Sequence, residues 1–241
     1  MQTNLSQSEQ KKLVGSYTIN KLIERNLIFS GMKIGLGTGS TAMPAVEQLA
    51  KRIQDGTLKD IKAVATSFQT TIACEQLGIP VYSLNAKEIA GELDLAIDGA
   101  DEIDQENHLI KGGGAALLNE KIVAYNANKF VIVADSSKDV KTLGTKFPLP
   151  VEIIGEARVS VIKKLEQMGA KCTLREGIKK AGPVITDNGN LILDLLWENP
   201  VNAELLEDSI NKIVGVVEVG FFTKNKPLVF IAQADGTVLE R

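Results

Sequence analysis

The sequence predicts an α/β protein: a Rossmann-like parallel sheet with helices on both faces, plus an inserted α+β domain of the ferredoxin-like type. Three observations support this. Short apolar strands alternate with helices over the first half of the chain, the pattern of a parallel sheet wrapped by helices. After Phe147-Pro148-Leu149-Pro150 the elements follow the order β-α-β-β-α-β. The length, 241 residues, suits one domain with a smaller companion.

The first part of the chain begins with a helix, because apolar residues recur at roughly helical spacing from Ser6 to Asn26. Strands and helices then alternate. We expect the strands at residues 32–36, 61–65, 80–82, 93–98 and 130–134, and the helices at residues 42–53, 69–77 and 115–126. The last apolar segment, Leu228–Ala232, is expected to return to this sheet.

The companion domain begins near residue 148. Its expected elements, in chain order, are a strand at 151–154, a helix at 157–168, a strand at 171–174, a helix at 202–213 and a strand at 216–219. Asn188-Gly189 is a hairpin signal between strands at Pro183–Thr186 and Leu191–Leu195. We therefore predict a Rossmann-like domain of residues 1–147 and 222–241 and a ferredoxin-like domain of residues 148–221.

The composition excludes several classes of protein. The chain has 27 Lys and Arg against 30 Asp and Glu, a net charge of −3, which argues against a protein that coats nucleic acid or an anionic membrane. No apolar run approaches the ~18 residues that a membrane span needs. Met1–Gln7 lacks the basic start and apolar core of a signal peptide. We therefore expect a cytoplasmic protein with no nucleic-acid or membrane partner.

Cysteine and histidine offer little for metal or thiol chemistry. Cys74 and Cys172 form no Cys-x-x-Cys pair, so a zinc ribbon or a thioredoxin-like site is excluded, and both are expected to be small buried apolar residues. His108 is the single histidine and stands near no nucleophile motif. We expect it to be non-catalytic and expect the chain to bind no metal.

Four segments with polar or glycine residues follow short apolar runs, three of them predicted strands and one the run Leu109-Ile110. They are Gly37–Thr41, Asp98–Glu102, Lys111–Gly114 and Asp135–Lys138. In an open parallel sheet, ligands bind beyond the carboxyl ends of the strands. We therefore expect these segments to converge on one edge of the sheet and to form a binding site there.

The first of these segments is a glycine-rich loop before a helix. Ser40 and Thr41 stand where a dinucleotide fingerprint would need a third glycine after Gly35 and Gly37, and the lysine of a P-loop is absent. Backbone N–H groups and hydroxyls at a helix N-terminus can hold a small phosphate or a polyol. The alternative is a tight turn whose Ser and Thr side chains cap the helix.

The second segment places two carboxylates on either side of a Gly-Ala turn. Asp98 and Asp101 have the spacing of a carboxylate pair that exchanges protons with a hydroxyl. The alternative is a solvated loop with turn-favouring Asp residues.

The third segment is a run of three glycines after Lys111. Each glycine weakens a helix or a strand by roughly 1 kcal/mol relative to alanine, so Gly112-Gly113-Gly114 indicates a close approach of the backbone to another group. Glu120, in the helix behind the glycines, would by itself be an exposed glutamate paired with a lysine. Its place behind the glycine run favours a functional role.

Six motifs occur along the chain in a characteristic order: Gly35–Ala42, Asp98–Glu102, Lys111–Leu117, Glu120-Lys121, Phe147–Glu152 and Thr186–Asn190. Together they resemble the signatures of type A ribose-5-phosphate isomerase, and the resemblance runs from about Lys11 to the last strand. It implies a Rossmann-like domain with an inserted ferredoxin-like domain, no cofactor, and interconversion of ribose 5-phosphate and ribulose 5-phosphate through an enediolate. The stretch 177–182 and the region around Phe68 depart from the pattern, and neither touches the acidic or glycine motifs.

The resemblance also implies roles for single residues. Glu120 corresponds to the general base and Lys111 to its electrostatic partner. Asp98 and Asp101 correspond to carboxylates that handle hydroxyl protons, and opening of the furanose ring is a natural task for Asp98. The implied substrate-binding residues are Thr38, Gly39, Ser40, Thr41, Asp98, Gly99, Ala100, Asp101, Lys111, Gly112, Gly113, Gly114 and Lys138.

Two other functions compete with this interpretation. A sugar-phosphate-sensing regulator would need a helix-turn-helix and a basic face, and neither is found at the termini. A coenzyme A transferase on a similar fold would place a glutamate nucleophile where Glu120 stands, usually in a longer chain. The expected partner is a sugar phosphate substrate, and the resemblance implies a homodimer or homotetramer.

Overall fold

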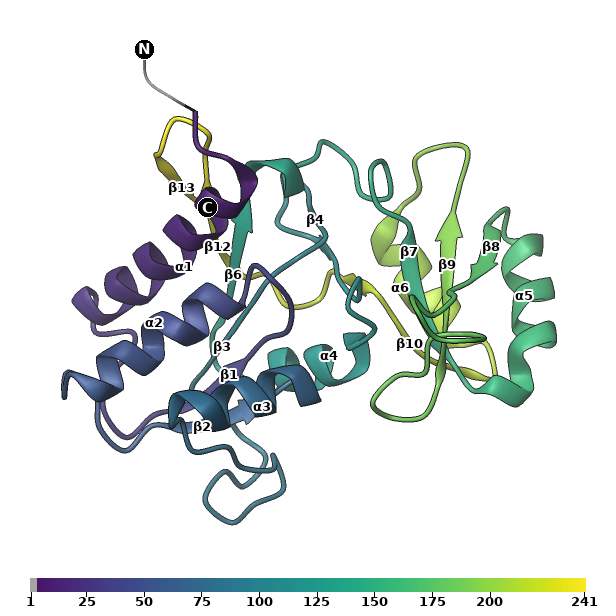
Figure 1. Ribbon diagram of the computed structural model, residues 1–241. Helices are drawn as coiled ribbons and strands as arrows, with labels where there is room; N and C mark the ends of the chain where they lie inside the picture. The colour runs from purple at the N-terminus through teal and green to yellow at the C-terminus, as the bar shows by residue number, and fades with distance from the viewer. Residues whose placement is uncertain (1–3) are drawn as a thin grey trace. The chain divides into compact units, whose positions relative to one another are not determined.

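A computed structural model describes residues 4–241, which fall into two compact units (Figure 1). The first unit holds the chain up to Ala100, then Asn119–Asp139 and Asn225–Arg241; the second holds Asp101–Leu118 and Val140–Lys224. Each unit has its own sheet and its own cluster of buried apolar side chains.

The first unit is built on a six-stranded sheet. In the order of the sheet, its strands are β13 (Val238–Glu240), β12 (Leu228–Ala232), β6 (Phe130–Asp135), β3 (Leu95–Asp98), β1 (Lys33–Leu36) and β2 (Lys62–Ala65). All neighbours are parallel except β12 and the edge strand β13. The predicted Rossmann-like sheet and the return of β12 to it are thus confirmed. The strands β3 and β6 are buried along their whole length, as expected for a sheet covered on both faces.

Helices α1 (Gln7–Glu24), α2 (Met43–Gln54), α3 (Phe68–Leu77) and α4 (Leu117–Tyr125) surround this sheet. The first begins with a capping box, in which the Ser6 and Glu9 side chains each accept a hydrogen bond from the other's backbone N–H. Right-handed crossovers between parallel strands place α2, which joins β1 to β2, and α4, which precedes β6, on opposite faces (Figure 1).

The second unit contains a four-stranded antiparallel sheet in the order β10-β7-β9-β8. In chain order its elements are β7 (Leu149–Ile153), α5 (Arg158–Gln167), β8 (Lys171–Leu174), β9 (Leu191–Leu196), α6 (Ala203–Asn211) and β10 (Val216–Val219). This is the predicted β-α-β-β-α-β order, and the expected ferredoxin-like fold is confirmed. A further sheet, which the sequence did not predict, joins β11 (Phe221–Phe222), β5 (Leu109–Ile110) and β4 (Glu102–Ile103).

Two predicted strands are wrong. The segment Pro183–Thr186 makes only one bridge to β9, from Ile185 to Leu191, because β9 already pairs with β7 and β8 on its two sides. The turn at Asn188-Gly189 is present, since the N–H of Thr186 donates to the carbonyl of Asn190 at 2.9 Å. The segment at 80–82 likewise makes a single bridge, between Val81 and Ala63.

The borders of the compact units differ from the predicted domain borders. By their contacts, residues 101–118 and 140–147 belong to the second unit, which extends to Lys224. The domain ranges 1–147 with 222–241 and 148–221 stay a prediction, because contacts in the folded chain do not report which segments fold independently.

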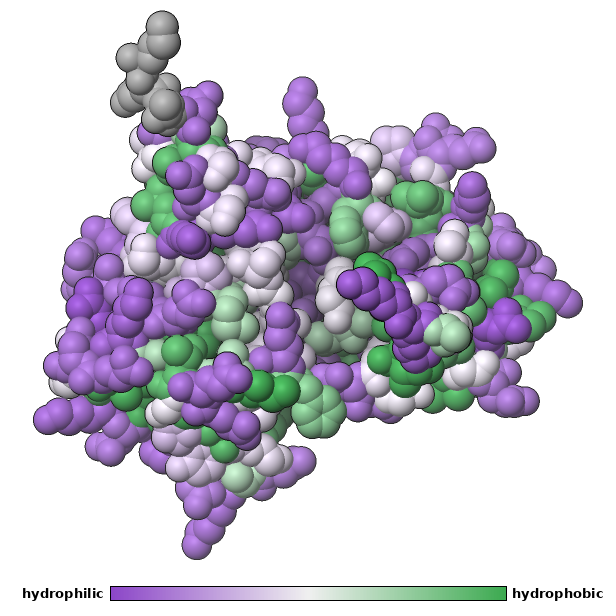
Figure 2. Space-filling view, viewed as in Figure 1, coloured by the Kyte–Doolittle hydropathy of each residue, from purple (hydrophilic) through white to green (hydrophobic). Residues whose placement is uncertain are grey.

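The described surface agrees with the composition. Hydrophilic residues predominate on the face seen in Figure 2, where hydrophobic residues form small separate groups. Within residues 4–241, no helix has the length and apolar character needed to cross a membrane. The expectation about a signal peptide rests in part on Met1–Thr3, which lie outside the described residues.

Candidate active site

In the first unit, the loops after β1 and β3 are joined through Asp98. Its Oδ1 accepts hydrogen bonds from the N–H groups of Thr38 at 3.1 Å and Gly99 at 2.7 Å. A Cβ on Gly37 would lie 1.9 Å from that same oxygen, so no other residue fits at position 37. These two loops therefore converge as the sequence predicts, and Gly37 is the residue that allows the close approach.

The Thr38 hydroxyl belongs to a cluster of side-chain oxygens. It lies 2.6 Å from the Thr66 hydroxyl and 2.7 Å from that of Ser67. The Thr70 hydroxyl donates to the carbonyl of Gly37 at 2.8 Å, which ties the loop to α3. Helix α2 begins after Ala42 with no side-chain cap. The capping alternative for the Thr38–Thr41 loop is therefore wrong, since its hydroxyls do not close the helix end.

A lysine that the sequence analysis did not select lies at the same loop. Lys11 Nζ, on α1, donates to Ser40 Oγ at 3.0 Å. The N–H of Gly39 donates to Gln69 Oε1 at 3.2 Å, and Gly39 has a φ of 95° that favours glycine. Thr41 is buried. The loop thus combines hydroxyls and backbone N–H groups with one positive charge.

The segment that carries Lys138 also contacts α1. Lys138 ends the short helix η1 (Ser136–Lys138), and the Asp135 side chain caps this helix by accepting from the N–H of Ser137 at 3.1 Å. Gln10 Oε1 accepts from the N–H of Ser136 at 3.1 Å. Since Gln10 and Lys11 are neighbours, α1 connects the Lys138 segment to the Ser40 loop.

Glu120 lies in the first turn of α4 with only 4% of its surface exposed. The burial contradicts the alternative of an exposed glutamate paired with a lysine, against which its place behind the glycine run already argued. Asp98 is likewise buried, at 3% exposure, and Ala100 is buried beside it in the chain. Burial of ionisable side chains is unusual and favours a functional role for both.

In the second unit, Asp101 holds the glycine run. Its Oδ2 accepts from the N–H of Gly113 at 2.7 Å, and a Cβ on Gly113 would lie 2.5 Å from its Oδ1. Gly112 has a φ of 101°, and a Cβ there would lie 2.9 Å from that of Leu117. The close approach predicted for the glycine run is confirmed: its partners are the Asp101 carboxylate and the start of α4.

Lys111 is buried, with 2% of its surface exposed, and its ammonium lies 5.6 Å from the centre of the Phe222 ring. Its backbone N–H donates to the carbonyl of Gly220 at 2.9 Å. A Cβ on Gly220 would lie 2.5 Å from the Lys111 carbonyl oxygen, so this anchor requires glycine. The strand β11, absent from the predicted elements, therefore fixes Lys111.

Glu102, the last residue of the acidic motif, turns out to be structural. Its buried carboxylate accepts the backbone N–H groups of Gly144 and Lys146 at 2.5 Å and of Phe147 at 2.8 Å. Three such bonds give a buried carboxylate the hydrogen-bond partners that it needs. Glu102 thereby holds the loop that leads into β7.

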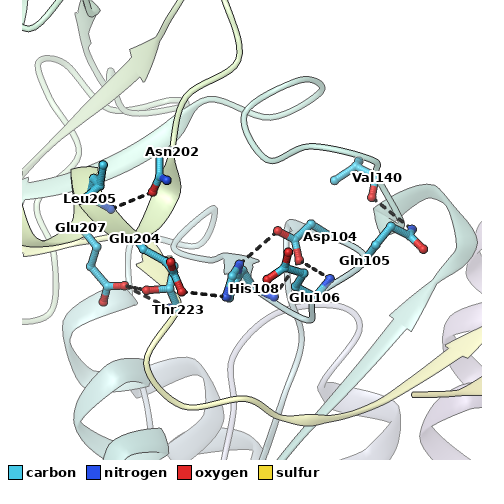
Figure 3. Close-up of polar contacts among 10 residues, drawn as sticks. All are labelled: Asp104, Gln105, Glu106, His108, Val140, Asn202, Glu204, Leu205, Glu207 and Thr223. Carbon is cyan, nitrogen blue, oxygen red and sulfur yellow. Dashed lines mark hydrogen bonds and ion pairs between the residues drawn. The ribbon is translucent and has the colours of Figure 1, made fainter.

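His108 lies between two carboxylates of the second unit (Figure 3). Its Nδ1 is 3.3 Å from Asp104 Oδ2, and its Nε2 is 3.5 Å from Glu204 Oε1, in the first turn of α6. The imidazole is buried. These contacts join the turn between β4 and β5 to α6, a structural role.

We expect His108→Gln to lower the free energy of unfolding by about 1–2 kcal/mol, because a buried side chain loses its polar contacts. Its kcat should match that of the wild type. Urea titration and steady-state assays measure both quantities, with Glu106→Gln at the exposed neighbouring position as the control. A large fall in kcat at unchanged stability would contradict the structural role.

Both cysteines are reduced and weakly acidic. Burial raises the pKa of the Cys74 and Cys172 thiols to about 11, with smaller contributions from Glu75 and Glu166 respectively. Few thiolates therefore exist near neutral pH. In the part of the chain that the structure describes, no group of three or more His, Cys, Asp or Glu side chains has a metal-binding arrangement.

Comparisons with known proteins agree on one family. Residues 62–236 match the family model described as ribose 5-phosphate isomerase A (phosphoriboisomerase A). The ribose-5-phosphate isomerase A of Treponema denticola is 59% identical over 96% of this chain and 98% of its own. The solved isomerase of Methanocaldococcus jannaschii is 42% identical, with a TM-score of 0.88 over 98% of this chain and all of its own. A D-ribose-5-phosphate isomerase solved with phospho-erythronic acid is 37% identical, with a TM-score of 0.91 over the same shares.

Proposed function

Because the chain belongs to the ribose 5-phosphate isomerase A family, we propose that it interconverts D-ribose 5-phosphate and D-ribulose 5-phosphate, an aldose–ketose isomerisation of the non-oxidative pentose phosphate pathway. The observation that supports this best is the match over residues 62–236, which includes Asp98, Asp101, Lys111, Glu120 and Lys138. The relative solved with phospho-erythronic acid, a phosphorylated sugar acid, supports a sugar phosphate as the ligand.

Glu120 is the proposed general base. It takes the proton from C2 of the open-chain aldose and returns it to C1, which moves the carbonyl by one carbon through an enediolate. One carboxylate serves both carbons, and a positioned base contributes roughly 10²–10⁴-fold to the rate. Its burial at 4% exposure limits competition from water.

Lys111 is the proposed electrostatic partner. The enediolate carries negative charge on oxygen, and a fixed cation stabilises that charge more than it stabilises the neutral substrate. The anchors of Lys111 on Phe222 and Gly220 hold its ammonium in place before the reaction begins.

Asp98 and Asp101 are the proposed proton carriers for the hydroxyl groups. We assign opening of the furanose ring to Asp98, whose Oδ1 is held by two backbone N–H groups. Asp101, held by the N–H of Gly113, exchanges protons with the oxygens on C1 and C2. Gly99 and Ala100 join the two carboxylates along the chain.

The remaining proposed contacts bind the substrate. Thr38, Gly39, Ser40 and Thr41 offer hydroxyls and N–H groups, and Lys138 offers a positive charge. Lys11, bonded to Ser40, places a positive charge at this loop, which suits a phosphate. In the second unit, Gly112, Gly113 and Gly114 provide backbone groups for the sugar oxygens.

The test is whether the purified chain converts ribose 5-phosphate to ribulose 5-phosphate. The absorbance of the ketose measures the product. The regulator and the transferase alternatives predict no product. A chain that binds ribose 5-phosphate but forms no ketose would refute the proposed function.

Dialysis against a metal chelator is expected to leave kcat unchanged, because every proposed proton transfer uses a side chain of this protein. The same assay before and after dialysis measures it, with mock dialysis as the control. If chelation abolishes isomerisation and zinc or magnesium restores it, the residue assignment is incorrect.

We also propose that this protein, as an enzyme that acts on a sugar phosphate, is located in the cytoplasm. We propose that it assembles as a homodimer or a homotetramer. Sedimentation equilibrium tests the assembly, and a monomer at assay concentrations would contradict it.

A further inference from the structure

The guanidinium of Arg175 contacts the glycine run of the second unit. Its Nη1 donates to the carbonyl oxygens of Gly112 at 2.9 Å and Gly113 at 3.1 Å. We propose that Arg175 is a positioning residue for isomerisation: it fixes the two glycine peptides so that their N–H groups face Asp101 and the substrate. The inference rests on the proposed function.

Arg175 is itself held rigidly. Its Nε donates to Asp194 Oδ2 at 2.8 Å and its Nη2 pairs with Asp194 Oδ1, a two-point contact of guanidinium and carboxylate. Its backbone N–H donates to the carbonyl of Ile192, and its carbonyl accepts from Val184, both at 2.9 Å. These contacts hold the guanidinium in place next to the end of β8, at the edge of the four-stranded sheet.

The planarity of the peptide group transmits this position to the glycine run. In a trans peptide the carbonyl and the following N–H point in opposite directions. With the Gly112 carbonyl on Arg175, the N–H of Gly113 points away and meets Asp101 Oδ2 at 2.7 Å. The Gly113 carbonyl accepts a hydrogen bond from the same Nη1 of Arg175, so the N–H of Gly114, in the same peptide group, must also point away from Arg175.

Within the run itself, one backbone hydrogen bond supports this geometry: the N–H of Ala115 donates to the carbonyl of Gly112 at 3.0 Å, while the Gly113 carbonyl is held by Arg175. Glycine has the widest choice of backbone conformations, so three in succession have little preference of their own. The N–H of Gly114 is then directed as a donor for a substrate oxygen, and the Asp101 carboxylate keeps its orientation. Both effects matter when charge develops on the sugar oxygens.

The bonding also argues against a direct role of Arg175 in substrate binding. Four hydrogen bonds from its three nitrogens go to Asp194 and the two glycine carbonyls. The Asp194 carboxylate balances its charge. A lysine would keep the charge and the ion pair but lacks the planar fork, so it cannot bind Asp194 and both carbonyls at once.

The experiment compares wild type, Arg175→Lys, Arg175→Ala and the control Arg158→Lys, which makes the same change at an exposed site of α5. We measure kcat, KM and the melting temperature of each. For Arg175→Lys we expect kcat to fall by about 10- to 100-fold, because small misplacements of reacting groups have effects of this size. KM should change less than about threefold, since the loss falls on the transition state.

A chemical rescue separates positioning from stability. Millimolar guanidinium chloride should raise the kcat of folded Arg175→Ala, and potassium chloride at the same ionic strength should not. The proposal is overturned if Arg175→Lys keeps the wild-type kcat, if it is unfolded at the assay temperature, or if folded Arg175→Ala gains nothing from guanidinium. If Arg175→Ala does not fold, the kcat of Arg175→Lys alone decides whether the positioning role holds. An inactive wild type would instead refute the proposed function.

Discussion

Glu120→Gln is expected to lower kcat by about two to four orders of magnitude, with a small change in KM. Glutamine keeps the size and the hydrogen-bonding shape of the side chain but cannot take a proton from carbon. Because Glu120 is buried in the first turn of α4, solvent cannot readily replace it as the base.

The measurement is steady-state isomerisation together with exchange of the C1 hydrogen of ribulose 5-phosphate with solvent deuterium. Both rates should fall by the same factor, since both begin with removal of a proton from carbon. The matched control is Glu47→Gln, an exposed position on α2, which should keep both rates. Exchange at the wild-type rate in Glu120→Gln would refute the assignment and make Asp101 the next candidate base.

Asp98→Asn is expected to slow the conversion of ribose 5-phosphate by about 10²-fold or more while leaving the fold intact. The amide oxygen of asparagine can still accept the N–H groups of Thr38 and Gly99, so both loops keep their positions. What is lost is the group proposed to move the proton during ring opening.

Deuterium exchange distinguishes Asp98 from Glu120. Ribulose 5-phosphate has no furanose ring to open, because its C5 oxygen carries the phosphate. Asp98→Asn should therefore keep much of the C1 exchange that Glu120→Gln loses. The control is Asp55→Asn, an exposed carboxylate that likewise accepts a backbone N–H, from Thr57. Near wild-type conversion of ribose 5-phosphate by Asp98→Asn would assign this aspartate to structure alone.

The sequence alone determined the layers of the fold and the segments of the candidate site. Periodicity predicted the strands β1, β2, β3, β6 and β12 of the parallel sheet, since each is a short apolar run beside a helix. Motif order indicated Asp98, Asp101, Lys111 and Glu120 as candidates. Each apolar run and each single motif lies within one element or one loop, so neighbouring residues suffice to reveal it, and the order of the motifs is read directly along the chain.

Only the tertiary structure showed what fixes those residues. Gly37 must be glycine because the Asp98 carboxylate fills the space of its Cβ. Lys11 lies 29 positions before Ser40, and Arg175 lies 63 positions after Gly112. Strand β11, whose Phe222 ring lies under the Lys111 ammonium, is farther still from Lys111 along the chain. No periodicity or motif relates residues so far apart, because their contact is created by the packing of whole elements, which decides which side chains meet.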